Sequence, residues 1–283
     1  MKQVILTSDS PADFPQGLNA RLKIRTIPLY VNLQGRSLRD GIEVTPAEIF
    51  ALYDQQNVIP TTSAIPVGDY KFFFAELLED GKNEIVHFCI GGQLSSSYQN
   101  AVTAAKEFEG VYVIDSESMS VGITLELIHA AAQRDAGLDA ASLAEDALKY
   151  RRLVRITALL GSPTYMKKSG RCSAVSALGA NLLNIRPVIG MSEGKLSSLK
   201  KLRGKPADVQ MQYLAGLLEN PDKFDTRAAF LYHTGVTPDE FQAQIKFVES
   251  KGIFEKLYTG HAGSITCTHV GDKATIFAYL VQQ

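Results

Sequence analysis

Short apolar runs alternate with helical patterns along the first half of the chain. Four runs have the length and composition of strands: Val4–Thr7, Thr26–Asn32, Glu84–Ile90 and Val111–Ile114. Apolar residues recur at helical spacing after Gly91–Gly92 through Phe108, and again over Gly122–Arg134. A strand, a helix and a second strand within roughly thirty residues form a βαβ unit, whose crossover is almost always right-handed. We therefore expect a Rossmann-like parallel sheet with helices on both faces.

Beyond about Tyr150 the pattern changes to a mixture of strands and helices. Ser192–Lys195 has the form of a hairpin turn between two extended runs. The other segments are an apolar run, a basic turn, a small and apolar stretch, two helices and two further apolar runs: Thr157–Gly161, Lys167–Arg171, Ala174–Leu183, Pro206–Leu218, Asp239–Glu249, Ala228–Tyr232 and Ala274–Val281. This order predicts an α+β domain over residues 151–283. A Rossmann-like domain over residues 1–150 precedes it, and its segment near 55–80 is expected to pack with the second domain.

The composition fits a globular protein of this architecture. The chain has 283 residues, of which 45% are hydrophobic and 21% charged, and this length suits two domains. A net charge of -1 without a block of like charges argues against nucleic acid as a partner and against an anionic membrane surface. The apolar runs are too short to span a bilayer, and the pattern of a signal peptide is absent. We expect a cytoplasmic protein that is not integral to a membrane and for which only transient membrane contact is possible.

Metal and cofactor chemistry finds little support in the sequence. The cysteines are far apart, in segments that predict burial: Cys89, Cys172 and Cys267. The five histidines pair with no other His or Cys at metal-binding spacing: His87, His129, His233, His261 and His269. A Walker loop, a Gly-x-Gly-x-x-Gly motif after the first strand and a Gly-x-Ser-x-Gly elbow are all absent. No metal, no cofactor and no catalytic residue is expected.

Hydroxyl groups gather where strands end and helices begin. Four clusters have this position: Thr7–Ser10, Pro60–Ser63, Gly91–Ser97 and Asp115–Ser116. Open α/β sheets place ligand sites at the carboxyl ends of their strands, and helix starts favour anions. Because Ser and Thr are also preferred N-caps, capping explains any one cluster taken alone. Together they indicate an anion site in the first half.

Two further groups in the second half are candidates for contact with an anion. Arg171 can pair with a carboxylate through two parallel hydrogen bonds, although an exposed arginine in a basic turn is an equally ordinary reading. His261 and His269 lie in a Gly-rich loop. For these histidines a ligand contact and a loop-bracing role both remain open.

At these residues the chain resembles the DegV family of fatty-acid-binding proteins, nearly from end to end. The resemblance depends on the order and spacing of short segments: Thr7–Ser10 with Asp13, Ile27–Leu29 with Asp40–Gly41, Pro60–Ser63, Leu94–Ala101, Val113–Ser116, Lys168–Ser173, Leu183–Val188, Gly194–Lys195 and His269–Gly271. It implies a DegV-like α/β fold with a Rossmann-like domain, an α+β domain and a lipid tunnel between them.

The resemblance also implies a function and a ligand site. Bacterial relatives bind a long-chain fatty acid, here expected to be C14–C18, and present its carboxylate to a separate fatty acid kinase that makes the acyl phosphate for phospholipid metabolism. The chain itself would then be a binding subunit rather than an enzyme. Carried onto this sequence, the family's carboxylate contacts and their neighbours are Thr61, Thr62, Ser63, Ser95, Ser96, Arg171 and His269.

The chain departs from the family pattern around this expected head-group site. The family's Thr-Ser-Gln-Pro is Thr62–Ile65, its Ser-Ser is Gly91–Gly92, its Ser-Gly is Ser95–Ser96, and its Gly-Pro-Gly is Gly271–Lys273. Two alternatives therefore stay open. One is a hydrolase or small-molecule phosphotransferase that uses Ser95 with His269 as base. The other is a divergent relative that binds another amphipathic anion.

Overall fold

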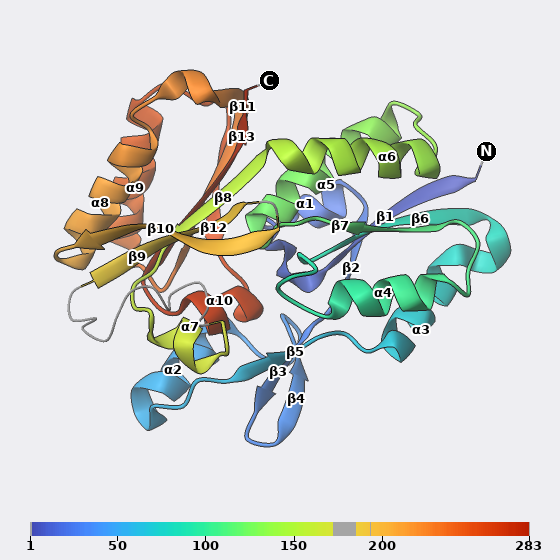
Figure 1. Ribbon diagram of the computed structural model, residues 1–283, viewed down its shortest axis with the longest axis horizontal. Helices are drawn as coiled ribbons and strands as arrows, with labels where there is room; N and C mark the ends of the chain where they lie inside the picture. The colour runs from blue at the N-terminus through green and yellow to red at the C-terminus, as the bar shows by residue number, and fades with distance from the viewer. Residues whose placement is uncertain (1, 172–184, 193, 283) are drawn as a thin grey trace.

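The computed structural model describes residues 2–171, 185–192 and 194–282. Cys172, Glu193 and the small, apolar stretch Ala174–Leu183 lie outside the described residues, so the predictions made for them cannot be compared with the fold. The described chain forms a mixed α/β structure with three sheets (Figure 1).

The first sheet is parallel and has the strand order β2-β1-β6-β7. Its strands are β1 (Gln3–Asp9), β2 (Ile24–Ile27), β6 (Asn83–Cys89) and β7 (Val111–Asp115), and its helices are α3 (Val67–Leu78), α4 (Ser97–Ala105), α5 (Val121–Asp135) and α6 (Ala140–Tyr150). Residues alternate between the two faces of β6: Ile85 packs with the α3 and α4 side, and Val86 packs with α5 and α6. The parallel sheet with helices on both faces confirms the prediction for the first half.

The prediction of one strand over Thr26–Asn32 was wrong. The chain leaves the parallel sheet after Ile27 and enters a second, antiparallel sheet of order β4-β3-β5, formed by β3 (Tyr30–Leu33), β4 (Arg36–Arg39) and β5 (Thr61–Ser63). Pro28 stands at the break, and a proline has no N–H group with which to continue a strand ladder. Helix α2 (Pro46–Gln56) follows, and Thr45 and Glu48 form the capping box at its start.

The third sheet has six strands in the order β10-β9-β8-β13-β11-β12, parallel only between β11 and β12. Its strands are β8 (Val154–Leu159), β9 (Ile185–Ser192), β10 (Lys195–Arg203), β11 (Phe224–Thr234), β12 (Leu257–His261) and β13 (Ala274–Val281). The predicted hairpin is confirmed, because Lys195 of β10 pairs with Ser192 of β9. Helices α8 (Pro206–Leu217) and α9 (Pro238–Ser250) pack on one face, close to the predicted ranges.

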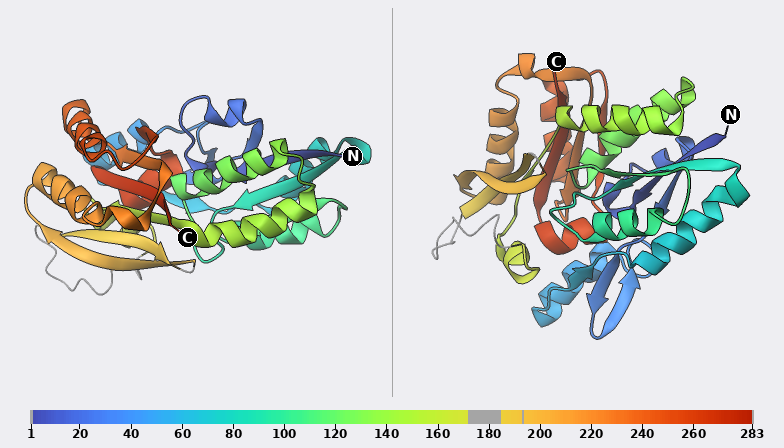
Figure 2. Two further views of the ribbon diagram at one scale, coloured as in Figure 1. Left: turned by 90° about the horizontal axis from the view of Figure 1, so that it is seen from above. Right: turned by 45° about the vertical axis from the view of Figure 1, so that its right-hand side comes forward.

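Helix α5 is shared by the two large sheets. Nine of its fifteen residues are buried. Val121 and Leu125 pack against β8 and β13 of the six-stranded sheet, while Ile123 and Leu127 pack against the parallel sheet. A helix that is apolar around most of its circumference has to be covered on all sides. Figure 2 shows α5 between the parallel sheet and the six-stranded sheet.

Helix α10 (Ser264–Val270) lies at the junction of α2, α7 (Thr164–Lys168) and the strands β3 and β5 (Figure 1). The expectation of a loop at His269 was therefore wrong, since His269 belongs to this helix, and β12 ends at His261. Short helical turns complete the description: η1 (Ser10–Ala12), α1 (Leu18–Arg21), η2 (Glu79–Gly81), η3 (Arg151–Leu153) and η5 (Pro221–Lys223). Among the described residues, no helix has the length and apolar character needed to cross a bilayer.

Candidate functional site

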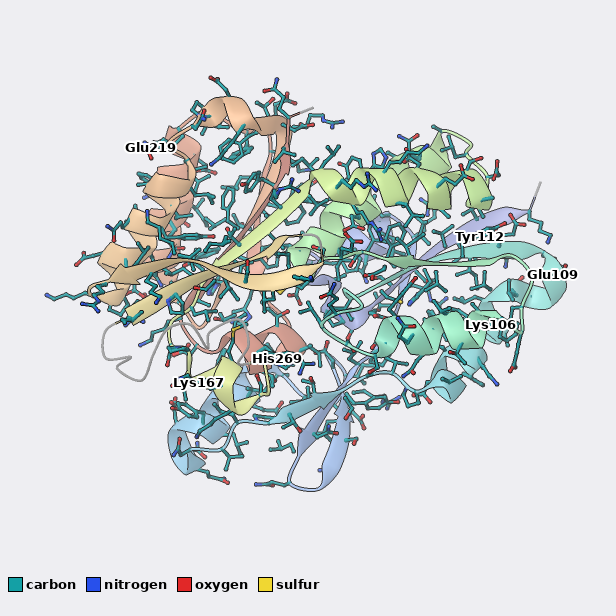
Figure 3. The ribbon with its side chains drawn as sticks, in the orientation of Figure 1. Lys106, Glu109, Tyr112, Lys167, Glu219 and His269 are labelled. Carbon is teal, nitrogen blue, oxygen red and sulfur yellow. The ribbon has the colours of Figure 1, made fainter. Side chains whose placement is uncertain are left out.

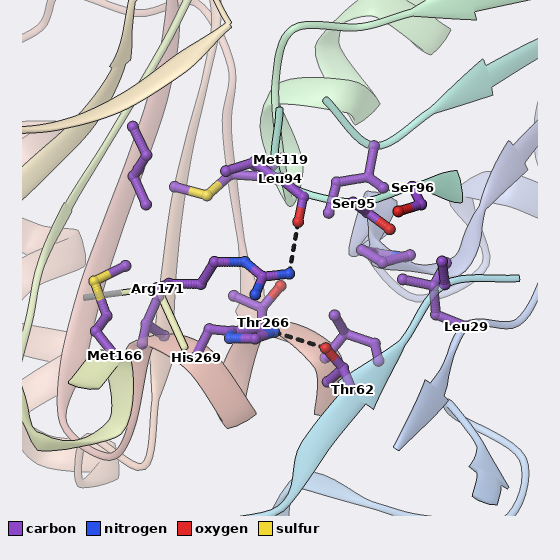
Figure 4. Close-up of a pocket in the computed structure, with 16 residues that line it drawn as sticks. Leu29, Thr62, Leu94, Ser95, Ser96, Met119, Met166, Arg171, Thr266 and His269 are labelled. Carbon is purple, nitrogen blue, oxygen red and sulfur yellow. Dashed lines mark hydrogen bonds between the residues drawn. The ribbon is translucent and has the colours of Figure 1, made fainter. Parts of the chain in front are cut away.

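A cavity of about 220 Å³ lies where the three sheets meet (Figure 4). One water needs roughly 10–15 Å³ of such space, so the cavity has room for a ligand of many heavy atoms. Apolar side chains form most of its wall: Pro11, Leu29, Ala64, Ile90, Leu94, Met119, Met166, Leu196, Ile265 and Val270. Six polar residues complete the lining: Thr62, Ser95, Ser96, Arg171, Thr266 and His269. An apolar wall with a few polar groups is typical of a small-molecule site.

One face of α10 forms a wall of the cavity. Ile265, Thr266, His269 and Val270 have the spacing of neighbours on one side of a helix, and all four line the cavity. Figure 3 shows His269 on this helix, at the centre of the molecule. Thr266 did not emerge from the sequence, because the pattern around it was interpreted as a loop. The helical spacing from Thr266 to His269 would have indicated it.

Asp13 from the first half of the chain holds the start of α10. Its buried carboxylate accepts hydrogen bonds from the Gly263 N–H at 2.8 Å and from the Thr266 hydroxyl at 2.7 Å, and the Ser120 hydroxyl also donates to it. Burial raises the pKa of Asp13 to about 6, although these hydrogen bonds oppose the rise. The sequence contained Asp13 within a family motif but gave it no role. Its role is to position the helix that carries His269.

His269 connects two hydroxyl groups across its ring. Its Nε2 lies 2.9 Å from Oγ1 of Thr62, and its Nδ1 lies 2.8 Å from Oγ of Ser169. Desolvation lowers the pKa of His269 to about 3, and the nearby charge of Arg171 contributes to the lowering. The imidazole is therefore neutral at neutral pH, with one N–H and one lone pair.

Arg171 extends from the end of α7 to the opposite wall of the cavity. Its backbone N–H donates to the Met166 carbonyl at 3.0 Å, across Gly170 at a φ of 81°, a bond that closes the C-terminus of α7. Its guanidinium donates through Nη2 to the Leu94 carbonyl at 2.6 Å (Figure 4). This contact fixes a positive charge at the polar end of the cavity, close enough to His269 to lower its pKa. A guanidinium in this position can neutralise a bound anion.

Ser95 and Ser96 line the cavity at the start of α4. The Ser97 N–H donates to Oγ of Ser95 at 3.2 Å, and the hydroxyl oxygens of Ser95 and Ser97 lie 2.9 Å apart. Ser96, the N-cap residue, forms no capping bond with its side chain. The positive end of the α4 dipole therefore lies beside two residues that line the cavity, an arrangement that favours an anion there.

The predicted pair of Ser95 with His269 as base is not hydrogen bonded in this structure. Oγ of Ser95 contacts Ser97, whereas the two ring nitrogens of His269 contact Thr62 and Ser169. A nucleophile and its base normally lie within hydrogen-bond reach of each other. The geometry thus favours binding of an anion over nucleophilic attack by Ser95.

The structure places Thr61 and Ser63 away from the cavity. Both residues are exposed on β5, on either side of Thr62. Since successive side chains of a strand point to opposite faces, only Thr62 of the three can face the cavity. Oγ of Ser63 accepts a hydrogen bond from the Asn32 amide at 2.5 Å on the outer face. The other predicted contacts, Thr62, Ser95, Ser96, Arg171 and His269, all line the cavity.

Two glycines pack tightly against neighbouring side chains. A Cβ atom at Gly92, where the family pattern has a serine, would lie 2.8 Å from Oδ2 of Asp115 and 3.0 Å from the ring of Tyr98. Gly271, which agrees with the family pattern, follows α10 with φ of 75°, and a Cβ there would overlap the ring of Tyr165. A side chain at either position would require its neighbours to shift.

The sequence model of the DegV family of uncharacterised proteins matches residues 3–281. The chain belongs to the DegV family. A DegV domain-containing protein of Deinococcus radiodurans is 26% identical over 277 residues, which cover 96% of each chain. The recognition made from the order of short motifs is thus confirmed.

Solved structures of other bacterial proteins share the fold. A DegV family protein from Thermus thermophilus, described as binding fatty acid, has a TM-score of 0.89 and 28% identity, and the alignment covers 98% of this chain and 99% of that one. A stearic-acid-binding protein from Eubacterium ventriosum has a TM-score of 0.81 and 24% identity, with 99% and 98% covered. The predicted DegV-like α/β fold is confirmed by these similarities.

Proposed function

We propose that this DegV protein holds one long-chain fatty acid in the cavity at α10 and presents its carboxylate to a partner kinase, which makes the acyl phosphate. The observation that carries the proposal is the division of the cavity wall into a large apolar part and a polar group formed by Thr62, Ser95, Arg171 and His269. The DegV protein of T. thermophilus, which is described as binding fatty acid, supports the choice of ligand.

The polar group matches the chemistry of an ionised carboxylate. Arg171 supplies a positive charge, and the start of α4 supplies N–H groups and a favourable dipole. Hydroxyl donors at Thr62 and Ser95 can complete the hydrogen bonds of the carboxylate oxygens. Donors and positive charge both favour the charged form of a bound acid, so the ligand would be held ionised.

The apolar wall suits an alkyl chain. Each buried methylene contributes about 0.8 kcal/mol, so a dozen of them offer about 10 kcal/mol before the cost of ordering the chain. Met119 and Met166 are flexible enough to pack against chains of different shape. We propose a ligand of C14–C18 in a tunnel between the two halves, as the family resemblance implies.

The proposal includes a non-catalytic role in the cytoplasm and no cofactor. Both ring nitrogens of His269 are occupied by hydroxyl groups, which supports a structural use of the ring rather than proton transfer from Ser95. The kinase would supply the phosphoryl chemistry. A division into two domains near residue 150, with the segment near 55–80 packed against the second, is part of the same proposal.

Native mass spectrometry of the purified protein, before and after denaturing extraction, tests the ligand. A bound mass that matches one C14–C18 fatty acid supports the proposal. A bound amphipathic anion of another class, or an empty protein that hydrolyses esters, overturns it. For the partner, fatty acid kinase and ATP should convert the bound acid to acyl phosphate, and unbound acid at the same concentration should react more slowly.

Substitutions at the polar group test the site. Arg171→Ala should weaken retention of fatty acid roughly 10- to 100-fold, because a hydrogen bond to a charged group contributes about 1.5–3 kcal/mol. Thr62→Ala should weaken it less, and neither change should unfold the protein. Thr61→Ala is the matched control, since Thr61 is exposed on the same strand. Equal retention by all three variants would remove Arg171 and Thr62 from the site.

A further inference from the structure

Ser169 lies behind His269, on the side of the ring opposite to Thr62. The residue is 7% exposed, and its backbone N–H donates to the Tyr165 carbonyl at the end of α7. Its hydroxyl oxygen lies 2.8 Å from Nδ1 of His269, while Nε2 lies 2.9 Å from Oγ1 of Thr62. The imidazole therefore joins two hydroxyl groups, and of the two only that of Thr62 lines the cavity.

Two arrangements of the protons fit a neutral imidazole with one N–H and one lone pair. In the first, the Ser169 hydroxyl donates to Nδ1, and Nε2–H donates to Oγ1 of Thr62. In the second, the Thr62 hydroxyl donates to Nε2, and Nδ1–H donates to Oγ of Ser169. The two arrangements differ in which hydroxyl proton remains free.

Only the first arrangement leaves Thr62 a proton to donate into the cavity. In the second arrangement Thr62 would face a bound carboxylate with lone pairs alone, and two acceptors repel each other. The second arrangement also leaves the Ser169 proton in need of an acceptor. Within the described parts of the chain, His269 is the sole hydrogen-bond partner of the Ser169 hydroxyl. A buried hydroxyl proton without an acceptor is costly, so the first arrangement is favoured.

We propose that Ser169 is a positioning residue that fixes His269 in its Nε2–H form, so that Thr62 donates its hydroxyl hydrogen bond to the carboxylate of the ligand. Ser169 does not touch the ligand and acts through two successive hydrogen bonds. This role rests on the proposed function, because it requires a carboxylate at Thr62. It also gives Ser169, as part of the Lys168–Ser173 motif, a function distinct from that of Arg171.

Nitrogen-15 NMR of the His269 ring reads this arrangement directly. In the wild-type protein Nε2 should be protonated and Nδ1 should not, with or without added palmitate. In Ser169→Ala the donor to Nδ1 is lost, so the Nδ1–H form should become populated. Retention of palmitate should fall about 3- to 10-fold, which corresponds to the loss of one neutral hydrogen bond. Ser169→Thr keeps the hydroxyl and should restore both readouts.

The control is Ser250→Ala, which removes a hydroxyl that donates to the Phe247 carbonyl on α9, away from the cavity. It should change neither readout. Unchanged ring signals and palmitate retention in Ser169→Ala overturn the role of Ser169, as does a wild-type ring protonated on Nδ1, a result that needs no variant to fold. A wild-type protein that binds no fatty acid overturns the proposed function itself. The two failures are therefore distinguishable.

Discussion

Contacts of very different range hold the two polar walls of the cavity, α10 and the start of α4. Asp13 contacts α10 from 250 residues away in the sequence, and Thr62 contacts His269 from 207 residues away. At α4, in contrast, Ser95 bonds to Ser97, two residues away, and Ser97 and Asn100 bond to Ile65, 32 and 35 residues away. The first wall joins the two ends of the chain, whereas the second is held by contacts of shorter sequence separation. A change to the first should therefore affect stability and binding together, and a change to the second should affect mainly binding.

Removal of Asp13 should have the largest effect. Asp13→Ala leaves the Gly263 N–H and the hydroxyls of Ser120 and Thr266 without their buried acceptor. Each unsatisfied donor costs about 1–3 kcal/mol, so we expect the free energy of unfolding to fall by at least about 3 kcal/mol. Urea denaturation measures this loss, and fatty acid retention should fall with it. Asp222→Ala, an exposed position, is the control. Equal stabilities of the two variants would contradict the role given to Asp13.

Gly271→Ala should destabilise the protein by about 2–3 kcal/mol. A side chain at this positive φ is strained, and its Cβ also overlaps the ring of Tyr165 beside α10. Gly252→Ala is the comparison, because Gly252 has a φ of 61° and open space where its new Cβ would lie, whereas Gly271 combines a φ of 75° with a ψ of −174°. The Gly252 variant should cost only about 1 kcal/mol. Thermal and urea unfolding of both variants measure the extra cost of the backbone strain and the Tyr165 contact together, and equal losses would contradict it.

The neutral His269 makes part of the stability dependent on pH. Its pKa is about 3 in the folded protein and about 6.5 when unfolded, so the unfolded chain binds more protons between these values. Stability from this group is complete above pH 6.5 and is lost as the pH falls. The loss between pH 6.5 and pH 5 is about 2 kcal/mol. His269→Gln should remove this loss of stability. Asp13 titrates in both proteins, so the difference between their free energies of unfolding reports His269 alone. If that difference did not change between pH 6.5 and pH 5, the role of His269 would be contradicted.

A change at the start of α4 should have the smallest effect on stability. Ser95→Ala removes one half-buried hydroxyl at the start of α4, and the buried Ser97 hydroxyl keeps its hydrogen bond from the Ile65 N–H. We expect a change of about 0.5–1 kcal/mol in the free energy of unfolding. Retention of fatty acid should fall roughly 3- to 10-fold. Calorimetry and a lipid-retention assay on the same sample give both numbers. A loss of stability as large as that of Asp13→Ala would remove the contrast between the walls.

Patterns within short segments predicted much of the fold from the sequence. The parallel sheet, α5, the β9–β10 hairpin and the helices α8 and α9 all follow from local periodicity and turn residues. Helix α10 was missed because its signals are not local: seven residues rich in Thr and Ser have no strong helical pattern, and its start is held by Asp13. The strand break at Pro28 could have been predicted, because proline removes a donor from the ladder.

The candidate site, like the fold, could be predicted from the sequence only in part. Five of the seven contacts carried over from the family line the cavity, but the alternation along β5 places Thr61 and Ser63 outside it. That alternation is visible in a sequence only once the strand is known. Ser169 was in a recognised motif, yet its contact with the ring of His269 depends on the packing of α7 against α10. Such contacts require the tertiary structure.

Helix α5 limits how the molecule can open to admit a ligand. Separating the two large sheets would expose the buried side chains of α5, namely Val121, Ile123, Leu125 and Leu127. Exposing each of them would cost about 1.5–3 kcal/mol of folding free energy. A hinge at α5 is therefore disfavoured, and the two halves should unfold in a single cooperative transition. A fatty acid would then have to enter without separation of the two large sheets along α5.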